Sequence, residues 1–170
     1  MKLADRLTNQ LKQSRDFCEK LLEPFKTPED WTHQVSPGTN HALWFCGHMA
    51  TADNFFIGMI EPAKKRDLED WDKHFGMGSK PTSDPDDYPP AAEVLDAMRE
   101  RRGVLLGLLA KMSDADLAKK TPEGTPDFVP DYAAIFEMAN WHEGLHAGQI
   151  TMVRRSLGHK PVFSPETVSA

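Results

Sequence analysis

Apolar residues recur every three or four positions along four stretches of this chain, and Pro-rich segments separate the stretches. This spacing places apolar side chains on one face of an α-helix. The pattern predicts helices over residues 3–23, 40–61, 89–112 and 131–157. Pro24 ends the first stretch and Gly158 follows the last, and both are residue types that stop helices. No stretch alternates as a half-buried strand does, so we expect an all-α, four-helix bundle with long connectors.

The predicted connectors differ in length. Residues 27–39 are rich in turn formers and have room for one short helical turn at 27–30. Residues 63–88 are long for a bundle connector, and they carry Trp71, His74 and Phe75. These aromatic side chains predict that part of the connector packs over one end of the bundle, with His74 in a loop.

Length and charge narrow the functional classes. A chain of 170 residues is most simply one domain, here residues 1–170. The net charge of -6 and the pI near 5.6 argue against a nucleic-acid partner. No apolar run approaches the roughly 20 residues that span a bilayer, and the polar start predicts no secretory signal. Cys18 and Cys46 form no disulfide framework, so we expect two buried free thiols in a cytoplasmic protein.

Three histidines fall on the apolar faces of predicted helices: His48 on the second, and His142 and His146 on the fourth. The last two are four residues apart, a spacing that puts both on one face. Buried neutral histidines need hydrogen-bond partners, and a single metal ion would accept a lone pair from all three. Three histidines with an open position suit catalytic zinc, and imidazole also suits nickel, copper and iron. The histidines expected in loops or at helix ends, where no ligand is predicted, are His33, His41, His74 and His159.

The segment from His142 to His146 also matches H-E-x-x-H, the zinc-peptidase motif. The extended form of that motif requires Gly and His where Gln149 and Met152 stand, and no strand is predicted to hold a peptide. A metallopeptidase is therefore an alternative that lacks its third ligand. Three interpretations of Glu143 stay open. It is a solvated helix residue, which is the simplest interpretation, or a hydrogen-bonding partner of a metal ligand, or a general base.

Other polar and aromatic residues near the histidines have two interpretations each. Gln149 lies one turn from His146 and is either a hydrogen-bonding residue of the site or a partly buried polar residue. Together with Glu143 it is a candidate catalytic residue. Asp53 could orient a ligand histidine, but exposure on the outer face of its helix is the simpler expectation. The aromatic residues expected in the core, or as walls of an apolar pocket, are Trp44, Phe45, Phe55 and Trp141.

Three segments carry a resemblance to a known family. They are LWFCGHMA at residues 43–50, HExxHxGQI at 142–150 and RRSLG at 154–158. Over residues 3–158 the chain resembles the DinB-like superfamily of metal-dependent enzymes. The resemblance implies an up-down-down-up bundle, a divalent ion (zinc or nickel) on His48, His142 and His146, and frequent homodimers. Ala147 departs from the family pattern, since many relatives carry His or Arg there.

Characterised relatives of the DinB-like type include S-transferases and isomerases that use low-molecular-weight thiols such as bacillithiol or mycothiol. The resemblance therefore implies a metal-dependent enzyme, a thiol-dependent S-transferase or a hydrolase, acting on a small molecule with a thiol as a possible cosubstrate. Two other classes stay open. One is a non-catalytic metal-binding or regulatory bundle, and the other is a structural bundle without metal.

Overall fold

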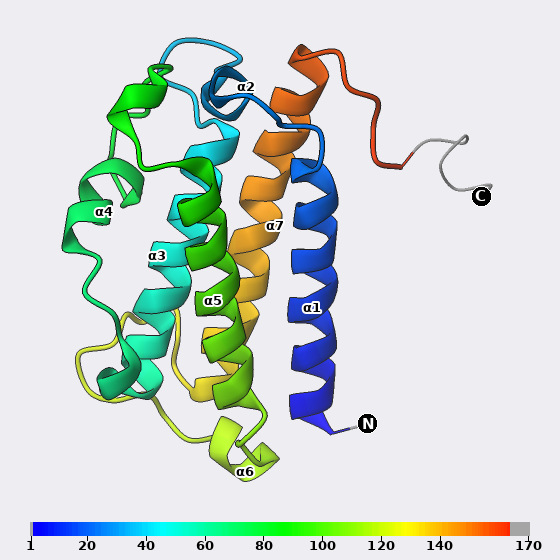
Figure 1. Cartoon of the computed structure of the whole chain (residues 1–170). Helices are drawn as coiled ribbons and strands as arrows, with labels where there is room; N and C mark the ends of the chain where they lie inside the picture. Colours follow the sequence, from blue (N-terminus) through cyan, green and yellow to red (C-terminus); the bar gives the residue numbers. More distant parts are fainter. Residues whose placement is uncertain (1, 164–170) are drawn as a thin grey trace.

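The computed structural model describes residues 2–163, and its regular structure is helical. Four long helices form the bundle: α1 (Leu3–Leu22), α3 (Ala42–Ile60), α5 (Ala91–Leu109) and α7 (Tyr132–Ser156). Figure 1 shows α1 and α7 running upward and α3 and α5 running downward, in the up-down-down-up order. Each helix lies within a few residues of its predicted range, so the all-α bundle is confirmed.

Three short helices and two 3₁₀ turns lie in the connectors. They are α2 (Pro28–Thr32), η1 (Pro62–Lys64), α4 (Glu69–Phe75), η2 (Pro85–Asp87) and α6 (Asp114–Leu117). The predicted turn at 27–30 is α2, which begins with a capping box between Thr27 and Asp30. Such a box satisfies backbone N–H groups that a five-residue helix would otherwise leave unpaired.

The long connector packs on the bundle in two places. α4 packs alongside α3, and η2 contacts α2 at the upper end of the bundle (Figure 1). There the hydroxyl of Thr32 donates to the backbone oxygen of Ser83 at 3.0 Å. The part of the connector that lies at an end of the bundle is therefore η2, while the aromatic residues of α4 lie along its side. This path carries the chain from the lower end of α3 back to the upper end of α5. His74 lies in α4 and not in a loop. The helix forms there because its first turn is acidic, its last turn is basic, and Phe75 is fully buried at its end.

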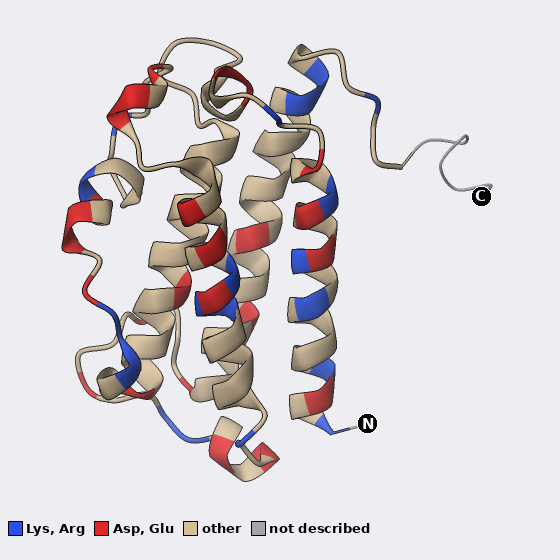
Figure 2. Cartoon of the chain, in the orientation of Figure 1, with Lys and Arg blue, Asp and Glu red and all other residues tan. Residues whose placement is uncertain are grey.

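The interior has two apolar clusters, one toward each end of the bundle. Between them lies a buried charged layer made by Arg15, Asp53, Arg102 and Glu143, and Figure 2 shows acidic and basic positions at this height of the bundle. The histidines that carry the candidate chemistry lie beside this layer, since His142 directly precedes Glu143 on α7 and His48 lies just over one turn before Asp53 on α3. A charged layer inside a bundle requires mutual pairing, because an unpaired buried charge is strongly destabilising.

Some side chains expected in the interior are exposed. The relative exposure is 44% for Phe55 and 60% for Trp141. Helical periodicity identifies an apolar face, but it does not say whether another element covers that face. Trp44 and Phe45 are buried as expected.

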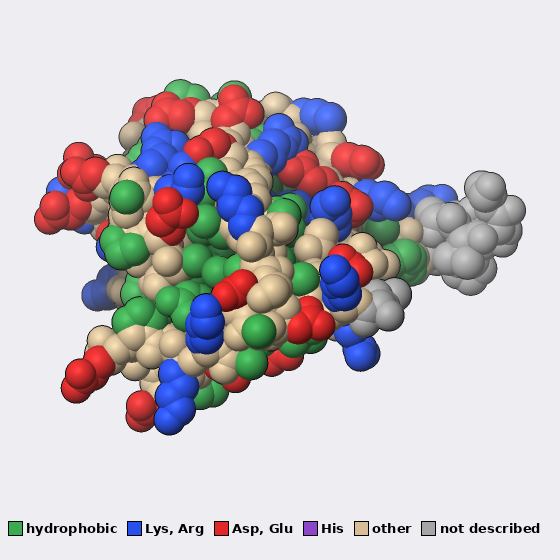
Figure 3. Space-filling model, turned by 90° about the horizontal axis from the view of Figure 1, so that it is seen from below, with side chains coloured by type: hydrophobic (Ala, Val, Ile, Leu, Met, Phe, Trp, Pro, Cys, Tyr) green, Lys and Arg blue, Asp and Glu red, His purple; other side chains and the backbone are tan. Residues whose placement is uncertain are grey.

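Surface charge is mixed where it is seen from the lower end (Figure 3). Basic, acidic and hydrophobic side chains are interspersed on that face. Among the described residues, no helix combines the length and the apolar character needed to cross a membrane.

Candidate metal centre

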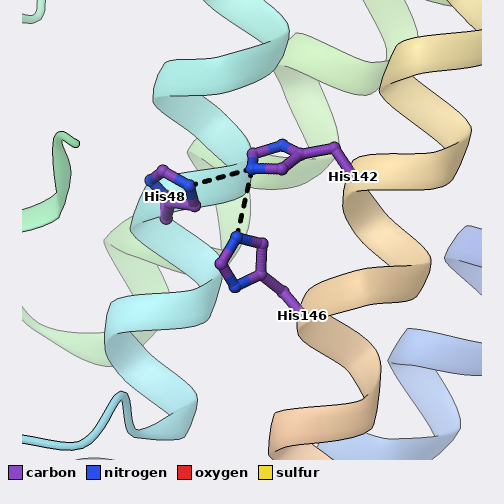
Figure 4. Close-up of side chains that lie close together, drawn as sticks. All are labelled: His48, His142 and His146. Atoms are coloured by element: carbon purple, nitrogen blue, oxygen red, sulfur yellow. Dashed lines mark hydrogen bonds between the residues drawn. The ribbon is translucent and has the colours of Figure 1, made fainter.

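The three predicted histidines come together between α3 and α7. Nε2 of His142 lies 3.1 Å from Nε2 of His48 and 3.1 Å from Nε2 of His146 (Figure 4). One potential ligand atom from each ring lies within 4.8 Å of the others. Nitrogen ligands at about 2.1 Å from a tetrahedral zinc ion are about 3.4 Å apart. The spacing of the three rings therefore suits one ion.

The far nitrogens of two rings have oxygen partners. Nδ1 of His48 lies 2.7 Å from the backbone oxygen of Phe75, and Nδ1 of His146 lies 3.0 Å from Oε1 of Gln149. Because these oxygens only accept, each Nδ1 carries the hydrogen and each Nε2 keeps a lone pair. His142 can place at most one hydrogen between two such lone pairs. A cation would satisfy all three rings, so the donor set fits a metal ion.

Burial keeps these rings in the neutral form that metal ligation requires. Loss of hydration lowers the pKa of His48 to about 4, and loss of hydration together with neighbouring His48 and His146 lowers the pKa of His142 to about 4. Burial also lowers the pKa of His146. The lone pairs are thus available at neutral pH.

The sequence matches one family over most of its length. Residues 10–150 match the family model described as the DinB superfamily. The chain belongs to the DinB superfamily. No curated protein matches it. The match to the DinB superfamily includes all three histidines, and it confirms the family that the sequence motifs indicated.

Glu143 of this DinB-superfamily protein is not a solvated helix residue, because its side chain is fully buried. Oε1 accepts from Nε of Arg15 at 2.5 Å, and Oε2 accepts from Nη1 of Arg102 at 2.6 Å and from Oγ of Ser14 at 3.1 Å. Glu143 lies about 100° around the helix from His142, which turns it toward α1 and α5. Both of its oxygens are occupied away from the histidines.

Asp53 is buried and does not lie on the outer face, contrary to the sequence prediction. It accepts two hydrogen bonds from Arg102, at 2.8 Å from Nε and 3.1 Å from Nη2. Arg15 lies 3.4 Å from the same carboxylate. Asp53 and Glu143 are thus held by the same two arginines, and the four charges cancel.

Sequence reasoning missed both arginines. Each one interrupts an apolar stripe: Arg15 falls between Leu11 and Cys18, and Arg102 falls between Met98 and Leu105. A charged residue at an interior position was the available signal. It could have predicted buried carboxylates on the facing helices, since buried charges need partners.

Gln149 lies beside the histidines and orients one of them. Its Oε1 accepts from Nδ2 of Asn40 at 3.0 Å and faces Nδ1 of His146 at the same distance. His41 caps α3, with its Nδ1 accepting from the backbone N–H of Trp44 at 3.0 Å. The four other histidines, His33, His41, His74 and His159, lie outside the cluster.

The geometry is unfavourable to the peptidase alternative. The third histidine comes from α3, upstream of the H-E-x-x-H segment, and Glu143 is paired with arginines. Among residues 2–163 there is no β-strand to hold a peptide; a single isolated bridge joins Lys120 and Asp131. The motif match therefore reflects two histidines on one helical face and an interior glutamate between them.

Proposed function

We propose that this chain is a metal-dependent enzyme that holds a divalent ion, zinc or nickel, on His48, His142 and His146. The supporting observation is the convergence of three neutral imidazoles, two of them with the hydrogen held on the far nitrogen. A divalent cation lowers the pKa of a thiol or water that it binds, and so supplies a nucleophile near neutral pH. Three protein ligands leave room for such a molecule.

We further propose that the nucleophile is a low-molecular-weight thiol and that the reaction is an S-transfer to a small electrophile. Among the described residues, no carboxylate is hydrogen-bonded to the three histidines, and Glu143 and Asp53 are neutralised by arginines. A thiol, with an ordinary pKa of about 8.5, needs less help from a protein base than water does. This favours a transferase over a hydrolase.

The same lack of a free base supports a second candidate, a non-catalytic metal-binding or regulatory bundle. In that protein Gln149 would serve only to orient His146, as it does here. The two candidates share the ion and differ in turnover. The small-molecule substrate, the cytoplasmic location and the homodimer also stay predictions, the last testable by light scattering of the purified protein.

Metal content tests the ion directly. Protein purified without a histidine tag should carry close to one equivalent of zinc or nickel. His142→Ala and His146→Ala should lose it, while His33→Ala should keep it, because His33 bonds Ser156 on the surface. A wild-type protein without metal affinity, or full occupancy in both ligand variants, would overturn the assignment.

Turnover tests the enzyme. The metal-loaded protein should transfer thiols such as bacillithiol or mycothiol to epoxides or chloronitroarenes. The rate should disappear after chelation and return on adding metal. A loaded protein with no rate above the uncatalysed reaction across such a panel would favour the binding module.

A further inference from the structure

The connector after α3 supports His48 in two ways, once by a direct contact and once through Trp44. The backbone oxygen of Phe75 faces Nδ1 of the ring at 2.7 Å. Oγ of Ser79 accepts from Nε1 of Trp44 at 2.8 Å, and the Trp44 indole stacks on His48 with ring centroids 4.4 Å apart and 17° between the planes. A single segment therefore supports the edge of the imidazole directly and its face through Trp44.

The carbonyl of Phe75 is available because of its place in α4. Phe75 is the last residue of this helix, and the last carbonyls of a helix have no N–H partner within it. The bond to His48 supplies that partner. A carbonyl at the end of a seven-residue helix thus determines which nitrogen of His48 carries the hydrogen.

The aromatic ring of Phe75 determines where this carbonyl lies. The ring is fully buried and sits against Gly47, where an added Cβ would be 2.2 Å from its Cγ. Trp71 and Tyr88 pack on its other sides, with ring centroids 5.5 Å and 5.7 Å away. Only glycine at position 47 leaves space for the ring. Because the ring and the carbonyl belong to the same residue, the packing that holds the ring also fixes the position of the carbonyl.

We propose that α4 is a clamp for the metal centre, in which Gly47 admits the ring of Phe75 so that the Phe75 carbonyl holds His48 in its ligating orientation. Gly47 and Phe75 are positioning residues, since neither touches the ion. The role of the clamp in metal affinity rests on the proposed function, but the hydrogen bond belongs to the metal-free chain. Coupling is reciprocal, so an ion on the histidines stabilises docked α4 in turn.

Gly47→Ala tests the clamp. The added methyl should displace α4 and weaken zinc binding about 10–100-fold, the range typical of lost support to a ligand histidine. Gly103→Ala is the matched control, because Gly103 is a helical glycine of α5 with open space around its Cβ. Its zinc affinity should equal that of the wild type.

Two further measurements separate positioning from general damage. Nitrogen-15 NMR of the metal-free protein should show the hydrogen of His48 on Nδ1 in the wild type and in Gly103→Ala, and not in Gly47→Ala. Hydrogen exchange should show slower exchange of α4 amides when zinc is added to the wild type. If Phe75 and Gly47 only pack against each other, neither the tautomer change in Gly47→Ala nor the slower exchange of α4 with zinc is expected.

A double-mutant cycle covers the possibility that one variant is unstable. Phe75→Ala removes the ring, so adding Gly47→Ala to it should cost little further zinc affinity. Ser79→Ala removes only the support to Trp44 and should give a smaller loss.

Unchanged zinc affinity and an unchanged His48 tautomer in Gly47→Ala would overturn the clamp and leave the proposed function standing. A wild type that binds no zinc would overturn the proposed function, while the tautomer would still test the clamp.

Discussion

Glu143→Gln distinguishes a structural glutamate from a catalytic one. The wild-type layer holds two arginines, Arg15 and Arg102, against two carboxylates, Asp53 and Glu143. Removing the charge of Glu143 leaves one positive charge without compensation in the fully buried layer. Breaking such a pair from one side costs about 3–5 kcal/mol of the free energy of unfolding. The same substitution at a catalytic base in contact with solvent would instead change the free energy of unfolding by less than about 0.5 kcal/mol.

Urea unfolding followed by circular dichroism measures this difference. With a urea slope of about 2 kcal/mol/M, the predicted loss lowers the unfolding midpoint by about 2 M. Glu137→Gln is the matched control, since Glu137 is exposed on the same helix. The folded fraction of Glu143→Gln should still bind metal. A midpoint shift no larger than that of Glu137→Gln, with turnover abolished, would refute the structural assignment.

Three other outcomes follow from the same contacts. Burial lowers the pKa of His41, His48 and His142 from 6.5 to about 4. Between these two pH values the unfolded chain therefore binds more protons than the folded chain. The free energy of unfolding of the metal-free protein should therefore fall as the pH falls from 6.5 to about 4, and urea titrations with a flat profile there would contradict the burial of these rings. Free zinc at about 100 times its dissociation constant should raise the free energy of unfolding by about 2.7 kcal/mol, and His142→Ala should show no such increase in thermal melts. Burial raises the pKa of the Cys18 and Cys46 thiols. A disulfide reagent should therefore modify neither thiol in the folded protein and both thiols after unfolding. Rapid modification of the native chain would show that the thiols are accessible.

The helices and the histidine pair on α7 were predictable because their signals are local. Periodic apolar residues, Pro24 and Gly158 mark helices within a window of a few turns. The i, i+4 spacing of His142 and His146 already places two ligands on one face. His48 could be added because it too falls on an apolar stripe, where a lone histidine needs a partner.

The roles of the charged residues and of the long connector were not predictable in this way. Glu143 and Asp53 each look like ordinary helix residues until α1 and α5 bring Arg15 and Arg102 to them. Apolar periodicity likewise cannot tell that Phe55 and Trp141 are exposed, because exposure depends on which element covers a face. The contact of Phe75 with His48 joins two segments that share no local pattern.

The sequence by itself therefore determined the four helices, their apolar faces and the three histidines that could share an ion. Tertiary structure alone decided that Glu143 is an interior counter-charge and that α4 supports His48. The physical reason is the range of each interaction. Helix formation and the spacing of side chains on one helix depend on neighbours within a few residues, whereas charge pairing and ring orientation depend on atoms that only packing brings together.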